Sequence, residues 1–157
     1  MIEAALVHAP GVATLGEAAD LDNVLSAVLA EAGIDHEAEV VGLDVRLVEA
    51  EESADLNGRY RDKPYATNVL SFPADARVPG FWALGDLVIC RSIVVDEAQA
   101  QHKSVTAHWM HMLVHGCFHL LGFDHIGDDE AEIMEAAERR VMAQLGFADP
   151  YAKTEPL

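Results

Sequence analysis

Apolar and polar residues follow two repeating patterns along the chain. Alternating or continuous apolar runs predict strands over residues 2–7, 39–48, 68–72 and 84–90. Helices are predicted from Thr14 or Asp20 to about 32, over 50–60, from Ser92 or Asp96 to about 102, from Ser104 or Thr106 to 121, and from 128 to about 145. Pro73 is expected to end the third strand, before a loop over 74–83 that turns at Pro79-Gly80.

The order of these elements predicts the fold class. Strands alternate with helices in the first part of the chain, and helices follow one another in the last part. This order is typical of an α/β (α+β) domain, with a small, mostly four-stranded mixed sheet and helices packed on it. The helix over 104–121 is apolar on much of its surface, so we expect it to be central. We expect all 157 residues to form a single domain, and 149–157 is the only candidate for a disordered tail.

The net charge of −17 is unevenly distributed. Residues 1–55 contain 13 acidic residues and one basic residue, and residues 128–157 contain eight acidic and three basic residues. The middle, 56–127, holds six of each and is neutral. A strongly acidic chain argues against nucleic-acid binding, but a neutral centre that binds a metal cation would be locally positive. The acidic flanks are expected to aid solubility and to reduce nonspecific binding of polyanions.

Several features of the sequence predict a cytoplasmic protein. No apolar run approaches the ~20 residues of a membrane span, and the N-terminal residues lack the basic and apolar regions of a secretory signal. Cys90 and Cys117, the only cysteines, both lie in apolar sequence. They fit buried, reduced thiols better than a disulfide framework.

Residues 115–125, His-Gly-Cys-Phe-His-Leu-Leu-Gly-Phe-Asp-His, carry a pattern typical of a metal site. His115 and His119 are four residues apart, so they lie on the same face of a helix. Gly122 can adopt the left-handed conformation that ends a helix, which lets the chain bring His125 toward the first two rings. Three neutral imidazoles suit one Zn2+ ion with a fourth position left for water. The alternative is a histidine-rich helix packed in a core, which does not explain the glycine.

The same spacing occurs in zinc proteases of the metzincin type, His-Glu-x-x-His-x-x-Gly-x-x-His. Gly116 stands where such proteases have the glutamate that serves as general base. Peptide hydrolysis would lack this base, whereas zinc still lowers the pKa of a bound water to about 7 and can polarise a phosphoryl oxygen. Phosphodiester cleavage also needs a cation for the non-bridging oxygens, a role that suits arginine.

The histidine motif and further blocks of sequence resemble the YbeY family, bacterial rRNA maturation factors described as zinc-dependent endoribonucleases. The blocks are 56–63 (Leu-Asn-x-x-Tyr-Arg-x-Lys), 67–73 (Thr-Asn-Val-Leu-Ser-Phe-Pro), 85–90 (Gly-Asp-Leu-Val-Ile-Cys) and 108–112 (His-Trp-x-His-Met). The resemblance covers roughly residues 40–145. The chain departs from the family at 64–66, Pro-Tyr-Ala, where the family usually has Asp-x-Pro or Asp-Pro-Thr, so the shape of this loop stays open.

The resemblance implies that His115, His119 and His125 bind one Zn2+ ion and that Arg61 is the catalytic arginine. It implies cleavage of single-stranded RNA in rRNA maturation, including processing of the small-subunit rRNA 3′ end, and in ribosome quality control. The nucleophile stays open between a metal-activated water and a ribose 2′-OH. Expected partners are rRNA, the small ribosomal subunit and ribosome-associated proteins, without DNA or a membrane. Single-stranded targets also suit a small cleft, which cannot reach inside a stacked duplex.

Other polar residues near these blocks each have two interpretations. Asp124 can support the neighbouring histidine or cap the helix end, and His111 can contact the site, although a hydrogen-bonded core histidine is favoured. Lys63 and Arg59 can line an RNA groove, but exposed basic residues near a loop usually only face solvent. Structural roles are favoured for Ser71, His102, His108 and Cys117.

Three functions compete on the sequence alone. They are a metal-dependent endoribonuclease, a non-catalytic ribosome-assembly factor whose metal holds the fold, and a metallopeptidase or other zinc hydrolase. The glycine at 116 disfavours the last. The cation at Arg61 favours the first, with a surface ion pair to Asp55 or Asp62 as its alternative role.

Overall fold

The structure, a computed structural model, describes residues 1–124 and 126–152, and within them a mixed four-stranded sheet carries five helices. This confirms the predicted α/β (α+β) fold class. The strands are β1 (Ile2–His8), β2 (Val40–Val48), β3 (Val69–Val78) and β4 (Phe81–Cys90). The helices are α1 (Ala18–Glu31), α2 (Ala50–Arg61), α3 (Arg91–Ala100), α4 (Val105–Leu120) and α5 (Asp128–Gln144).

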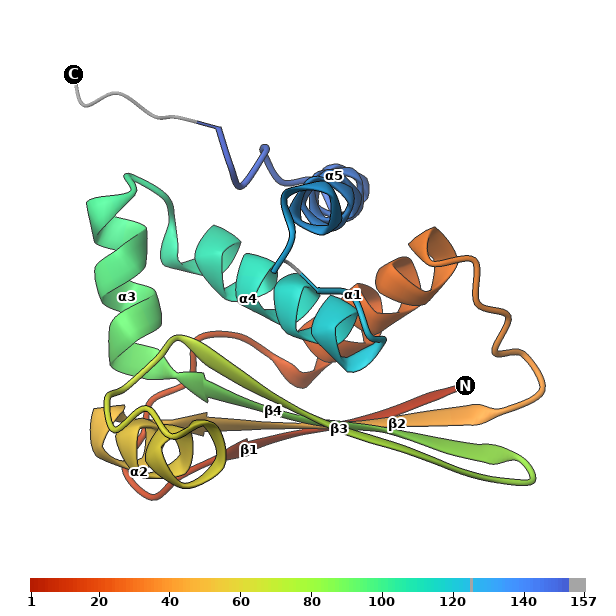
Figure 1. Cartoon of the computed structure of the whole chain (residues 1–157), viewed down its shortest axis with the longest axis horizontal. Coiled ribbons are helices and arrows are strands. Elements are labelled where there is room, and N and C mark those ends of the chain that lie inside the picture. Colours follow the sequence, from red (N-terminus) through yellow and green to blue (C-terminus); the bar gives the residue numbers. More distant parts are fainter. Residues whose placement is uncertain (125, 153–157) are drawn as a thin grey trace.

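The sheet has the strand order β1-β2-β4-β3. Strands β1, β2 and β4 run parallel, and β3 pairs antiparallel with β4 at the edge. Helices α1 and α4 cover one face, α5 lies over them, and α2 lies on the opposite side of the sheet (Figure 1). Helix α4 therefore lies between the sheet and α5, which confirms its predicted central place.

Strand β3 is longer than the sequence predicts. Pro73 was expected to end it, and 74–83 to form a loop, but β3 continues to Val78 and β4 begins at Phe81. Pro73 is tolerated because β3 is an edge strand and its register with β4 shifts between Pro73 and Ala76. The predicted turn at Pro79-Gly80 is confirmed between the two strands.

Two helix starts also differ from prediction. Neither Thr14 nor Asp20 is the N-cap of α1, because Glu17 occupies that position and Asp20 lies in the first turn. The Asp20 carboxylate accepts hydrogen bonds from the Glu17 main-chain N–H at 2.8 Å and from the Trp109 indole at 3.0 Å, so it joins α1 to α4. Helix α3 begins at Arg91, before either predicted start.

Helix α4 is held in place by its cap and by two glycines. The Ser104 hydroxyl accepts a hydrogen bond from the Ala107 N–H at 3.0 Å, which confirms Ser104 as the cap. A Cβ atom at Gly116 would lie 2.7 Å from Leu87 on β4, and one at Gly85 would lie 2.9 Å from Leu120 on α4. Glycine at both positions thus lets helix and sheet approach closely. Apolar side chains of α4 fill the core. Among them are Trp109, Met112, Leu113, Val114, Cys117, Phe118 and Leu120.

Among residues 1–124 and 126–152, no helix combines the length and the apolar character that a transmembrane span needs.

Candidate active site

His115 and His119 lie on one face of α4, at its C-terminal end. Their Nε2 atoms are 3.0 Å apart, and their ring centroids are separated by 4.5 Å. The predicted convergence of these two rings is therefore present. His119 is in the last turn of α4, where the negative end of the helix dipole favours a bound cation.

The end of α4 has the geometry expected from the glycine in the motif. Gly122 has a φ of 94°, and its N–H donates to the His119 carbonyl at 3.0 Å. The Phe123 N–H donates to the Phe118 carbonyl at 3.0 Å, which completes a left-handed helix end. The chain thus turns back after Gly122, as predicted. His125, the third expected ligand, lies outside the described residues.

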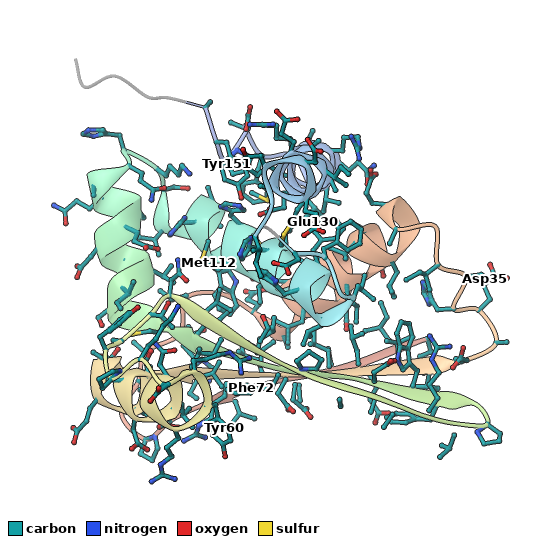
Figure 2. The ribbon with its side chains drawn as sticks, viewed as in Figure 1. Asp35, Tyr60, Phe72, Met112, Glu130 and Tyr151 are labelled. Carbon is teal, nitrogen blue, oxygen red and sulfur yellow. The ribbon has the colours of Figure 1, made fainter. Side chains whose placement is uncertain are left out.

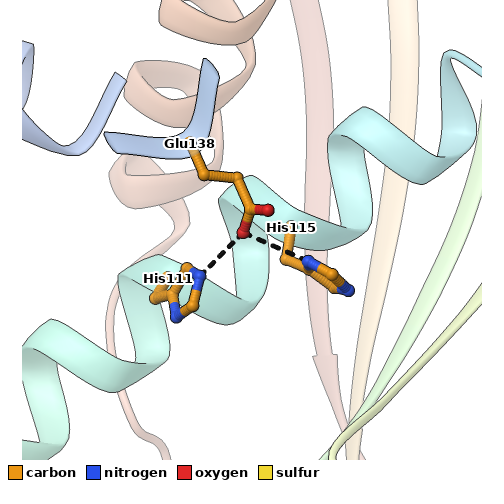
Figure 3. Close-up of side chains that lie close together, drawn as sticks. All are labelled: His111, His115 and Glu138. Carbon is orange, nitrogen blue, oxygen red and sulfur yellow. Dashed lines mark hydrogen bonds and ion pairs between the residues drawn. The ribbon is translucent and has the colours of Figure 1, made fainter. Parts of the chain in front are cut away.

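A buried carboxylate from α5 holds the other side of the His115 ring. Glu138 is fully buried, and its Oε1 atom lies 3.1 Å from His115 Nδ1 and 2.7 Å from His111 Nε2 (Figure 3). The Tyr151 hydroxyl donates to both carboxylate oxygens at 3.0 Å. Three donors from α4 and from the chain after α5 therefore converge on one acidic side chain.

These contacts keep Glu138 ionised. Burial by itself raises the pKa of the carboxyl group, but hydrogen bonds from His111 and His115 outweigh it and hold the pKa at about 2. Burial also lowers the pKa of His111, which is therefore neutral near pH 7. The group thus carries one negative charge beside the histidine pair.

Arg61 lies across a cavity from the histidine pair. It is the last residue of α2, and its guanidinium donates to the Ser71 carbonyl at 2.6 Å and to the Tyr60 carbonyl at 3.2 Å. The cavity has a volume of about 510 Å3. Its wall consists of Arg61, His115, His119, Pro73 and residues 67–71 at the start of β3. The fold thus brings together the predicted arginine and two of the three predicted ligands.

An aromatic pair lies beside the Arg61 guanidinium. The rings of Tyr60 and Phe72 meet edge to face, with centroids 5.3 Å apart (Figure 2). The Arg61 guanidinium carbon lies 5.2 Å from the centroid of Phe72. Such a cation–π contact restrains the side chain without neutralising its charge.

The structure also locates the other polar residues that the sequence singled out. His111 is a buried histidine hydrogen-bonded to Glu138, as favoured. His108 is buried and lies 2.9 Å from Glu97, which supports its structural role. The Ser71 hydroxyl lies 3.5 Å from the Gly116 carbonyl, in agreement with a main-chain hydrogen bond.

Further candidates lie outside the cavity wall. Cys117 is fully buried, and burial raises the pKa of its thiol to about 12, so it is a core residue as expected. Arg59 forms an exposed ion pair with Asp55 on the same helix, and Lys63 and His102 are exposed. The Asp124 carboxylate accepts a hydrogen bond from the Ile126 N–H at 3.2 Å in the turn that follows α4.

Sequence reasoning missed Glu138 and Tyr151. A signal for the first was present, because Glu138 shares the buried stripe of α5 with Met134 and Val141. Tyr151 carried no such signal. It lies in the segment expected to form a tail, but residues 149–152 pack on α5, where Asp149 pairs with Arg139 at 3.2 Å. The rest of that segment, 153–157, lies outside the described residues.

The donor set fits a zinc ion at the histidine pair. Two nitrogens that bind one zinc ion at ~2.0–2.1 Å in tetrahedral geometry lie about 3.3 Å apart. The observed 3.0 Å between the Nε2 atoms is close to this value. A second group, His111, His115 and Glu138, also offers ligand atoms within 4.8 Å of one another. The structure therefore contains histidine and glutamate side chains that could hold a metal ion.

Comparisons with known proteins identify the family. The family model described as "Endoribonuclease YbeY" matches residues 13–146. Relatives with the same name include a protein of Pseudomonas savastanoi, 57% identical over 118 residues, which cover 72% of this chain and 69% of the relative. Another, from Pseudomonas putida, is 56% identical over 115 residues, which cover 72% of this chain and 73% of the relative.

A solved structure has the same fold. The solution structure of a Thermotoga maritima protein aligns with a TM-score of 0.54 at 24% sequence identity. The alignment covers 97% of this chain and 99% of the other. At this identity the likeness concerns the arrangement of helices and strands alone.

Proposed function

The chain belongs to the YbeY endoribonuclease family, and from this premise we propose that it is a zinc-dependent enzyme that cleaves single-stranded RNA. The cavity that joins Arg61 to His115 and His119 carries the proposal. One face of this cavity offers imidazole nitrogens to a metal, and the other offers a permanent cation to a phosphate. His125 completes the proposed ligand set on the spacing of the motif.

The metal preference follows from the donors. Imidazole nitrogens suit zinc, whereas magnesium and calcium favour oxygen ligands. Bound zinc would supply a Lewis acid that stabilises negative charge on a phosphoryl oxygen and lowers the pKa of a coordinated water. His115 and His119 would hold it at the cavity wall, within reach of a substrate phosphate.

Arg61 orients the phosphate and stabilises the charge that develops on it. Two of its N–H groups donate to the carbonyls of Tyr60 and Ser71, and the remaining N–H groups can bind non-bridging oxygens. Because both carbonyls belong to the main chain, the guanidinium is fixed before the substrate arrives. A cation placed in advance stabilises the transition state without reorganisation.

The cavity also favours a single strand. At about 510 Å3 it admits part of a nucleotide chain but no stacked duplex. Tyr60 and Tyr65 are exposed at and just after the end of α2, outside the wall of this cavity, so bases that leave it could stack on them.

The metallopeptidase alternative gains no support from the contacts at the site. A peptidase of the metzincin type needs a glutamate at position 116. This position is Gly116, and a Cβ atom built there would lie only 2.7 Å from the Leu87 side chain, so no glutamate fits without a shift of that side chain. Glu138 does not replace it, because it contacts Nδ1 of His115, on the far side of the ring from His119.

A cleavage assay tests the proposal. Zinc-loaded protein is incubated with labelled single-stranded RNA, the same sequence as an RNA duplex and as DNA, and an unfolded protein. We expect cleavage of the single-stranded RNA alone, its loss in His119→Ala, and full activity in His8→Ala, a control at an exposed histidine on β1. Proteolysis would favour the peptidase, and retained binding to small ribosomal subunits without any cleavage would favour the assembly factor.

The proposed physiological substrate is rRNA of the small ribosomal subunit, which places the enzyme in the cytoplasm. Cells depleted of the protein are expected to accumulate small-subunit rRNA with an extended 3′ end, and the wild type but not His119→Ala to restore its processing. Normal 3′ ends in depleted cells would refute this substrate.

A further inference from the structure

The contacts of Glu138 with His115 extend the site beyond its proposed ligands. Resting on the proposed function, we propose that Glu138 is a positioning residue, held by His111 and Tyr151, that fixes the His115 ring so that Nε2 faces the metal. Glu138 belongs to α5, whereas His111 and His115 both belong to α4. Figure 3 shows its carboxylate between the two rings.

The contact with Glu138 determines which nitrogen of His115 carries the hydrogen. The Glu138 carboxylate accepts hydrogen bonds on both oxygens, so the His115 Nδ1 atom 3.1 Å from Oε1 must carry the hydrogen. In a neutral imidazole the lone pair then lies on Nε2. Nε2 is also the atom that lies 3.0 Å from His119 Nε2. Glu138 therefore directs the ligand-capable nitrogen toward the cavity.

The carboxylate is itself restrained from two further sides. The His111 Nε2–H donates to it at 2.7 Å, and Nδ1 of the same ring is buried without a hydrogen-bond partner among the described residues. This fixes His111 as the Nε2–H tautomer. The Tyr151 hydroxyl donates to both oxygens at 3.0 Å, and burial raises the pKa of that hydroxyl, so it remains a donor.

Tyr151 is anchored in turn by the segment that follows α5. Its ring meets the His111 ring edge to face at 5.1 Å, and the Arg139 guanidinium carbon lies 5.3 Å from its centroid. Asp149 accepts hydrogen bonds from the Tyr151 N–H at 2.8 Å and from Arg139 at 3.2 Å. The Lys103 ammonium donates to the carbonyl of Pro150. The positioning group thus extends from α4 through α5 to residue 151.

Glu138 could instead be a metal ligand together with His111 and His115. Burial argues against a catalytic ion there, because Glu138 is fully buried and His111 is 5% exposed, so a substrate could not reach an ion between them. Such an ion would also need Nδ1 of His115, and would displace the hydrogen bond that leaves Nε2 for the cavity. A carboxylate already bound by three donors is better suited to orient a ligand.

Zinc affinity and ring tautomer together test this assignment. The variants are Glu138→Gln, Tyr151→Phe and, as a control on the exposed face of α5, Glu132→Gln. The zinc dissociation constant is measured by competition with a chromophoric chelator, and the His115 tautomer by 15N NMR of the metal-free protein. Thermal unfolding of each variant reports whether its fold is kept.

We expect Glu138→Gln to weaken zinc binding by about 10–100-fold and Tyr151→Phe by about 2–10-fold, with no change in Glu132→Gln. In the metal-free wild type, His115 carries its hydrogen on Nδ1, and in Glu138→Gln the Nε2–H form gains population. Zinc binding as tight in Glu138→Gln as in the wild type, or a wild-type hydrogen on Nε2, would overturn the proposal.

Two further outcomes separate the alternatives. Loss of zinc in Glu138→Ala as complete as in His119→Ala would make Glu138 a ligand and overturn its positioning role. If Glu138→Gln fails to fold, the wild-type tautomer and the Tyr151→Phe affinity decide the question. A wild type that binds zinc but leaves RNA intact would refute the proposed function, while the tautomer and affinities still decide the role of Glu138.

Discussion

The Arg61 guanidinium donates a 2.6 Å hydrogen bond to the main-chain carbonyl of Ser71, which ties the end of α2 to β3. A carbonyl restrains a cation without cancelling its charge. Within residues 1–124 and 126–152, the structure records no ion pair for Arg61, and Asp55 pairs with Arg59 instead, at 3.3 Å. The surface ion pair considered as an alternative role for Arg61 is therefore not formed there.

Replacing Arg61 should affect turnover rather than folding. We expect Arg61→Ala to lower kcat for RNA cleavage by about 10²–10³-fold, because a cation placed at the developing charge is lost. Arg61→Lys should recover little, since an ammonium cannot reproduce the planar fork. Zinc affinity and the melting temperature should stay at wild-type values. Arg59→Ala is the matched control, and equal losses in both variants would contradict a specific role.

Gly116 should tolerate no larger side chain without a loss of stability. In Gly116→Ala, overpacking against the buried Leu87 should cost about 1–3 kcal/mol, and the gain in helix propensity should return about 1 kcal/mol. We expect a net fall of about 1 kcal/mol in the free energy of unfolding, measured in urea. Gly58→Ala in α2 is the control, since its Cβ would meet nothing closer than 3.6 Å and should stabilise the protein. A stabilised Gly116→Ala would show that Leu87 yields freely.

Zinc should stabilise the folded protein through the histidine pair. A ligand at 100 times its dissociation constant adds about 2.7 kcal/mol to the free energy of unfolding when it binds only the folded state. We therefore expect chelation to lower the melting temperature of the wild type and added zinc to restore it. His119→Ala should melt at the same temperature with and without zinc. A zinc-dependent shift retained in that variant would locate the ion elsewhere.

The Glu97–His108 contact should make stability depend on pH. The hydrogen bond from His108 lowers the pKa of Glu97, although burial opposes it. Glu97 therefore stabilises the fold above the pKa that it has in the unfolded chain, and this stabilisation is lost as the pH falls through the lower folded-state value. At pH 7, Glu97→Gln should lower the free energy of unfolding by about 1 kcal/mol, a value reduced by solvent screening.

Urea unfolding between pH 7 and pH 3 checks this dependence. The difference between the wild type and Glu97→Gln should be constant near neutral pH and shrink in acid. Asp96→Asn, at the exposed neighbouring position, should follow the wild type at every pH. A difference that grows in acid would contradict the sign of the effect.

Local signals along the chain were sufficient to predict most of the fold. Ser104 and Gly122 mark the two ends of α4 because capping and left-handed geometry depend on a few neighbouring residues. The alternation in 39–48 likewise identified β2. The prediction that Pro73 ends β3 was wrong because an edge strand tolerates proline. The edge position of β3 follows from its pairing with β4, which the local sequence does not show.

The site was predictable only as far as its motifs extend. The spacing of His115 and His119 indicates a shared helix face, and the likeness to a family singled out Arg61. The contact between His115 and Glu138 spans 23 residues and depends on how α5 packs on α4. No periodicity in either helix encodes that approach, so only the three-dimensional structure shows it.

The order of α4 and α5 along the chain has a consequence for biosynthesis. Because Glu138 follows His115 by 23 residues, the ribosome releases the histidine helix before the helix that orients its ring. A nascent polypeptide that ends between them has not yet assembled its metal-binding geometry. Newly translated copies should therefore fix the orientation of the His115 ring only after α5 docks on α4.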